Sequence, residues 1–236
     1  MRTYTRHQLK QDQFTAGAKE TVSWVVEHRQ KLIYIAGALA VVVAVVLGLW
    51  AYYQQQDEGA GVALGHAIQV YQAPITGSQP AVPDTTSFAT VQDRAKAARA
   101  EFAKVAGTYS HTRSGALARY FMGVCDADAG NTTAAEQELK QVASSRDQDL
   151  AALAKFALAS LAHQAGRDDQ AIALYKDLID HPSNTVGKPS AQLALAAIYE
   201  TKQPADARAI YQQVQKDEPQ SPAAEIAANR LASVRQ

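Results

Sequence analysis

The side chains that could bind a metal or catalyse a reaction are few and scattered along the chain. The histidines show no pair at the helical spacing that metal ligands need, and they lie at His7, His28, His66, His111, His163 and His181. Cys125 is the only cysteine, so neither a disulfide nor a cysteine-rich zinc site can form within the chain. We therefore expect no bound metal and no cofactor.

No group of residues has the spacing of a catalytic site. The sequence contains no glycine-rich phosphate loop and no G-x-S-x-G nucleophile motif. Asp126 and Asp128 are two residues apart, so their carboxylates would point in different directions from a helix. Cys125 falls inside an apolar helical pattern, and we interpret it as a small buried side chain. These observations predict a protein that acts through its surface and is not an enzyme.

The charged residues are balanced in number but unevenly distributed. The 236 residues include 23 Lys and Arg and 23 Asp and Glu, so the net charge does not indicate a nucleic-acid partner. Residues 1–31 contain six basic and three acidic side chains, residues 32–53 contain none, and residues 54–236 contain 17 basic and 20 acidic ones. The chain thus divides into a basic segment, an uncharged segment and a slightly acidic remainder.

The uncharged segment, "LIYIAGALAVVVAVVLGLWAYY" at residues 32–53, has the composition of a transmembrane helix. As a helix it would span about 33 Å, which is enough to cross a bilayer core. A cleaved signal peptide would have a shorter apolar region nearer the N-terminus. Arg29 and Lys31 precede the segment, whereas Asp57 and Glu58 follow it. The positive-inside rule therefore places residues 1–31 in the cytoplasm and residues 54–236 on the other side of the membrane.

Two patterns near the predicted anchor each have two interpretations. Ala36, Ala40, Ala44 and Gly48 recur every fourth residue and form a small-residue stripe on which another membrane helix could pack. Alternatively, they reflect the general abundance of alanine in such segments. Residues 14–25 are amphipathic, which predicts either a short helix at the cytoplasmic surface or the first turns of an extended anchor helix.

A helical pattern recurs every 36 residues in the C-terminal part of the chain. The repeated positions are Ala135, Ala171 and Ala207, followed four residues later by Leu139, Tyr175 and Tyr211. Another helical pattern precedes each alanine, and prolines at 182 and 219 end two of the second helices. The period predicts an all-α array of helical hairpins, in which each hairpin packs on the next.

The repeat resembles the tetratricopeptide repeat, with its small residue in the first helix, A-x3-F in the second helix and a following proline. Met122-Gly123 and Leu158-Ala159 supply the small residue in two copies, and an interrupted copy can be assembled from residues 64–68 and 98–102. The resemblance implies a tetratricopeptide-like α-solenoid over residues 54–236, with a loop insertion at 73–90. Residues 221–235 are predicted to form a capping helix with Ser221 at its N-cap and Ala228 in its apolar stripe.

In tetratricopeptide arrays, the first helix of each hairpin lines a concave groove that binds proteins. The family's groove positions correspond here to Tyr120, Val124, Phe156, Ser160, His163, Gln192 and Tyr199. These residues lack the row of Lys and Asn that clamps a C-terminal carboxylate in other members, so we do not expect that activity. The alternative for each residue is that it only packs on its neighbours.

A cytoplasmic tail, one anchor and a short repeat array together resemble the ancillary subunit of the bacterial Sec translocon, a membrane-anchored periplasmic tetratricopeptide-like family. The local sequence that carries this resemblance most strongly is "EHRQKLIYIAGALAVVVAVVLGLWAYYQQ", in which basic residues lead into an apolar anchor. The resemblance implies an inner-membrane scaffold with a periplasmic array, which works beside the channel with a membrane-anchored chaperone of the peptidyl-prolyl isomerase type on secreted and outer-membrane proteins. The alternative is a scaffold for cell-envelope assembly in division, pilus or outer-membrane biogenesis. Neither interpretation predicts whether the chain self-associates.

Overall fold

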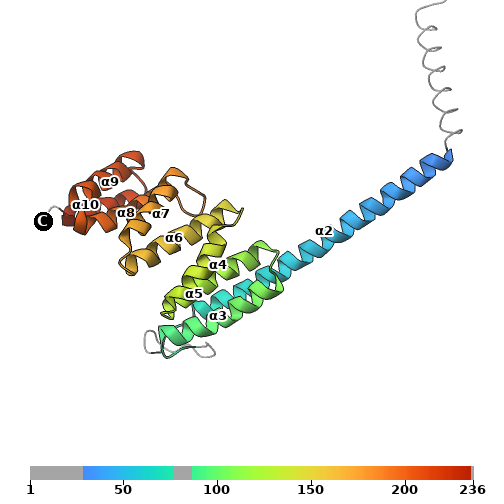
Figure 1. The fold of residues 1–236 in the computed structure, drawn as a ribbon, viewed down its shortest axis with the longest axis horizontal. Helices are drawn as coiled ribbons and strands as arrows, with labels where there is room; N and C mark the ends of the chain where they lie inside the picture. The colour runs from blue at the N-terminus through green and yellow to red at the C-terminus, as the bar shows by residue number, and fades with distance from the viewer. Residues whose placement is uncertain (1–28, 77–86, 235–236) are drawn as a thin grey trace, which may run out of the picture. The chain divides into compact units, whose positions relative to one another are not determined.

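A computed structural model of the protein describes residues 29–76 and 87–234 (Figure 1). The regular elements in these ranges are α-helices, which confirms the expected fold class. Two units can be distinguished, residues 1–55 and residues 56–236, and each is described separately below.

The first unit contains most of an apolar helix. Helix α2 (Arg29–Tyr71) is 43 residues long and continues without interruption past the predicted end of the anchor at residue 53. Its stretch Gly37–Tyr71 is long and apolar enough to cross a membrane, which is consistent with a single-pass membrane protein. The side chains of Ala40 and Ala44 are exposed, whereas the side chain of Ala36 and all of residues 14–25 lie outside the described part of the chain.

The second unit is an array of helical hairpins, in which each helix from α3 onward packs on the next (Figure 1). Residues 56–71 of α2 supply the first helix of the first hairpin. The remaining helices are α3 (Val91–Thr108), α4 (Arg113–Asp128), α5 (Thr132–Ala143), α6 (Gln148–Gln164), α7 (Asp168–Asp180), α8 (Lys188–Lys202), α9 (Pro204–Asp217) and α10 (Pro222–Val234). A β-bridge joins Ile75 to Phe88, on either side of residues 77–86.

Four apolar clusters follow one another along the array and share helices, so the core is continuous. They are centred on Phe102 between α2, α3 and α4, on Leu139 between α4, α5 and α6, on Tyr175 between α6, α7 and α8, and on Tyr211 between α8, α9 and α10. Each hairpin therefore buries its open face on the next hairpin, as the repeat pattern predicted.

The 36-residue period is confirmed in the second helices. The repeated alanines at 135, 171 and 207 are fully buried, and the Leu or Tyr four residues later is at most 4% exposed in every copy. A small residue on the first helix makes room for that side chain. At Gly123, for example, an added Cβ would lie only 2.7 Å from Leu139 Cγ.

The turns inside the hairpins differ between copies. Gly130 and Gly166 have φ values of 82° and 73°, a left-handed conformation that favours glycine, and they end α4 and α6. In the hairpin of α8 and α9, Gln203 alone separates the two helices, and Pro204 begins the second one. Three residues separate the helices in the two preceding hairpins, and the buried alanine of the first helix lies 11 residues before the repeated alanine here but 12 residues before it in the preceding hairpin. The buried alanine of the first helix therefore advances by 37 residues, from Ala159 to Ala196, while the second helices keep a spacing of 36.

Helix α10 closes the described array. The Ser221 hydroxyl accepts a hydrogen bond from the Ala224 backbone N–H at 3.2 Å, which confirms the predicted cap. Ala224, Ala227 and Leu231 are buried against the preceding helices. The predicted stripe was wrong at Ala228, which is exposed, because the helix turns the Ala227 side toward α8 and α9.

Candidate protein-binding surface

The first helices of three successive hairpins present equivalent faces. The reference point in each helix is the small buried residue at the hairpin crossing, which is Gly123, Ala159 or Ala196. The residues three positions before and one position after it share one flank of the helix. We call these six residues, Tyr120 and Val124, Phe156 and Ser160, and Leu193 and Ala197, the first-helix strip. None is charged; Ala197 is exposed and the other five are half-buried.

The aromatic members of the strip are held by the core beneath them. The ring of Tyr120 lies 5.3 Å from that of Phe121 in a T-shaped contact, and burial raises the pKa of the Tyr120 phenol. The ring of Phe156 lies 5.3 Å from that of Tyr175 and meets it edge-on. Because these rings are fixed by packing, a partner that contacts them loses little conformational entropy.

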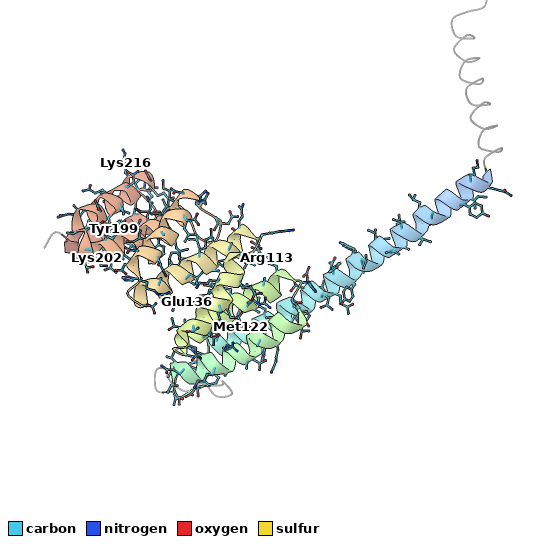
Figure 2. The ribbon with its side chains drawn as sticks, in the orientation of Figure 1. Arg113, Met122, Glu136, Tyr199, Lys202 and Lys216 are labelled. Carbon is cyan, nitrogen blue, oxygen red and sulfur yellow. The ribbon has the colours of Figure 1, made fainter. Side chains whose placement is uncertain are left out.

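Two of the predicted groove residues, both on α8, do not belong to the first-helix strip. Gln192 is only 7% exposed, and Tyr199 is half-buried between the apolar clusters of α6–α8 and α8–α10 (Figure 2). The prediction was wrong for the buried Gln192, because it assumed a spacing of 36 residues in the first helices, whereas the shorter turn makes the spacing 37; Tyr199 stays a prediction. Leu193 and Ala197 are the residues of α8 that correspond to Phe156 and Ser160 of α6. The signal in the sequence was Lys202, which stands where the other copies have glycine, together with Pro204.

His163, another predicted groove residue, belongs to a charged edge beside the turns of the hairpins. Its Nδ1 lies 2.6 Å from Asp168 Oδ1, and Asp168 Oδ2 accepts from Lys202 Nζ of the next hairpin at 2.5 Å. Lys202 and then His163 lower the pKa of the Asp168 carboxyl. The Lys202–Asp168 pair therefore joins the hairpin of α6 and α7 to the hairpin of α8 and α9.

A similar ion pair joins the hairpin of α4 and α5 to the hairpin of α6 and α7. Arg167 pairs with Glu136, and Lys140 donates to the same carboxylate at 3.0 Å. Hydrogen bonds from Arg167 and Lys140 lower the pKa of the Glu136 carboxyl. Figure 2 shows Glu136 and Lys202 on different hairpins of the array. The charged edge thus contributes to fixing the order of the hairpins.

Three other cations of the first helices are paired within their own hairpins. Arg119 of α4 lies 3.8 Å from Glu138 of α5, and Lys155 of α6 lies 2.6 Å from Asp177 of α7. Lys188 of α8 is 4.0 Å from a carboxylate of α9. These pairs hold the cationic groups of Arg119, Lys155 and Lys188 beside carboxylates of the second helices.

A buried polar contact between α3 and α4 was missed by the sequence analysis. Arg99 Nε donates to Asp126 Oδ1 at 2.7 Å, and Asp126 is only 2% exposed. Asp128 instead accepts from the Tyr71 hydroxyl at 3.0 Å, so the two carboxylates do contact different partners. Cys125 is fully buried, as interpreted, and burial is the main cause that raises the pKa of its thiol to about 12.

Comparison with known proteins identifies the repeat. The model of a family described as a tetratricopeptide repeat-like domain matches residues 23–177, which is more than half of the chain. No curated protein and no solved structure matches the chain. A domain of this kind suggests a scaffold for protein–protein interaction.

Proposed function

This chain belongs to the tetratricopeptide repeat-like domain family, and we propose that it is a membrane-anchored scaffold that binds proteins through the first-helix strip and has no catalytic activity of its own. The observation that supports the proposal is the recurrence of uncharged, partly exposed side chains at equivalent positions of three successive first helices. A surface repeated in this way suits an extended contact with another protein better than the conversion of a small substrate.

We place the protein in a bacterial inner membrane, with the N-terminus in the cytoplasm and the array in the periplasm. The apolar stretch of α2 supports a membrane location. The orientation rests on the charges at its two ends, since Arg29 and Lys31 precede the apolar segment and Asp57 and Glu58 follow it.

Within that membrane, we assign the protein to the Sec translocon as an ancillary subunit. Contacts at Ala40 and Ala44 would hold it beside the channel, and the first-helix strip would bind a membrane-anchored chaperone of the peptidyl-prolyl isomerase type. Secreted and outer-membrane proteins would then meet the chaperone as they leave the channel. Tethering places scaffold and partner at millimolar effective concentration, so a weak contact on the strip would suffice.

Photo-crosslinking in intact cells tests this function. A crosslinking amino acid is placed at Ala40 in the apolar helix, at Phe156 in the strip and, as a control, at Ala209, an exposed position on α9. The proposal predicts adducts of Ala40 with channel subunits, adducts of Phe156 with the chaperone, and few adducts at Ala209. Adducts of Ala40 and Phe156 with division, pilus or outer-membrane assembly proteins would refute the Sec assignment.

A further inference from the structure

We infer that the partner of the first-helix strip presents an amphipathic α-helix with an uncharged apolar face, and not an extended segment or a charged chain end. The inference rests on the proposed role of the strip as a binding surface. It specifies the chemistry of the partner, which that role leaves open.

The charges of the array indicate an uncharged partner face. The six strip residues carry no formal charge, and Arg119 and Lys155, their neighbours on α4 and α6, are already paired with carboxylates of second helices. A charged group buried on the strip would lose its hydration without gaining a counter-charge. Apolar side chains of the partner lose nothing comparable, because their burial is favourable.

The hydrogen-bonding groups of the strip indicate a helical partner. An extended segment that is buried needs a donor or acceptor for almost every peptide group. Apart from its own helical backbone, the strip offers only the hydroxyls of Tyr120 and Ser160, and Ser160 Oγ already accepts from Gln164 Nε2 at 3.2 Å. A helix satisfies its own backbone groups, so it can bury an apolar face on such a surface.

The sizes of the side chains fit the same partner. In each hairpin the first member of the strip is large, namely Tyr120, Phe156 or Leu193, and the second is smaller, namely Val124, Ser160 or Ala197. Large residues thus recur at one position of the first helices and smaller residues at the other. Helices pack by placing the ridges of one surface into the grooves of another, and recurring small residues leave room for such a ridge.

Fluorescence anisotropy with the full-length protein in detergent micelles tests the inference. The probe is a labelled amphipathic helical peptide of about 20 residues, with Leu and Phe at i, i+3, i+4 and i+7 spacing. A peptide of the same composition in scrambled order and one with a central proline are the comparison ligands. Ala197→Lys places a charge on the exposed strip position, and Ala209→Lys places the same charge on the exposed face of α9 in the same hairpin.

We expect the wild-type protein and Ala209→Lys to bind the helical peptide with equal Kd, and Ala197→Lys to bind it about tenfold more weakly. The scrambled and proline peptides should bind about tenfold more weakly than the helical one. The Kd of the helical peptide should change less than about twofold between low and high salt, because no charge pair contributes. Peptide that binds only the micelle would show no difference between the two Lys variants.

Equal binding of the helical and scrambled peptides, or equal binding by the two Lys variants, would overturn the inference. These results are separable from a failure of the proposed function. If the helical peptide binds as expected but crosslinking finds no translocon subunit, the inference stands and the Sec assignment fails. If Phe156 crosslinks the chaperone and the full-length protein binds no helical peptide, the inference fails and the scaffold role stands.

Discussion

Gly123 allows α4 and α5 to approach closely, and Gly123→Ala is expected to disturb that contact. An added Cβ would lie 2.7 Å from Leu139 Cγ, 3.0 Å from Leu139 Cδ2 and 3.3 Å from the Ala135 carbonyl oxygen. Carbon atoms in good contact are about 3.5 to 4.0 Å apart, so Leu139 has to move by about 1 Å. Its side chain is almost fully buried, which leaves little room for that movement.

Two opposing terms set the size of the effect. Overpacking of this kind costs about 1 to 3 kcal/mol. Alanine in place of glycine inside a helix recovers about 1 kcal/mol. We therefore expect Gly123→Ala to lower the free energy of unfolding by about 1 kcal/mol, which corresponds to a Tm lower by about 2 to 4 °C for a domain of this size.

A double-mutant cycle with Leu139→Ala separates the two terms. Leu139→Ala alone should cost about 2 to 5 kcal/mol, because it leaves a cavity. In that background, Gly123→Ala no longer meets the Leu139 side chain and should be neutral or stabilising. The coupling between the two substitutions should therefore be about 1 to 3 kcal/mol.

Denaturant unfolding followed by circular dichroism measures these differences. Gly107→Ala is the matched control, because Gly107 lies in α3 with no atom within 4 Å of an added Cβ. It should leave stability unchanged or raise it by up to about 1 kcal/mol. Strictly additive effects of Gly123→Ala and Leu139→Ala would refute the close approach of α4 and α5 at this position.

Three further predictions concern other parts of the array. In Gly115→Ala the new Cβ would lie 2.0 Å from the Tyr109 carbonyl oxygen, so the backbone itself has to move, and we expect a loss of more than about 3 kcal/mol in denaturant unfolding; a loss no larger than that of Gly107→Ala would contradict this. Because the folded state lowers the pKa of Glu136 below its ordinary value of 4.5, its pairing with Arg167 stabilises the protein above that pH and is lost as the pH falls through the lowered pKa. Glu136→Gln should therefore lower Tm at pH 7, and the difference from wild type should shrink in acid; a difference independent of pH would be inconsistent. Cys125 is buried with a pKa raised to about 12, so its thiol should react with Ellman's reagent at pH 8 only after unfolding, and rapid reaction of the folded protein would argue against its burial.

The second helices of the array could be predicted closely from the sequence. The period of 36 residues identifies Ala135, Ala171 and Ala207, and all three are fully buried. The prediction succeeds because a helix buries the same positions in every copy when hairpins repeat the same contact.

Helix α8, the first helix of its hairpin, shows where this reasoning fails. The period was applied to both helices, although one residue, Gln203, separates α8 from α9, whereas three residues form each of the turns that contain Gly130 and Gly166. Replacing a left-handed glycine turn by a single residue before Pro204 rotates α8 by one position. As a result, Gln192 is buried, and Leu193 lies on the strip where the period of 36 placed Gln192.

Contacts between distant residues could not be predicted from local patterns. Arg99 and Asp126 lie 27 residues apart, and their pairing depends on how α3 packs on α4. Lys202 and Asp168 likewise meet only because consecutive hairpins align their turns. Nothing in the spacing of these residues indicates the pairs.

The central claim, that partners bind through the first-helix strip, is tested most directly by crosslinking in cells from Phe156 in the presence of a second substitution. The account predicts that Ala197→Lys strongly reduces the yield of the Phe156 adduct, because the same partner covers both hairpins, whereas Ala209→Lys on α9 leaves the yield unchanged. An equal reduction of the adduct with both variants, or no reduction with either, would contradict the claim that the strip is the binding surface.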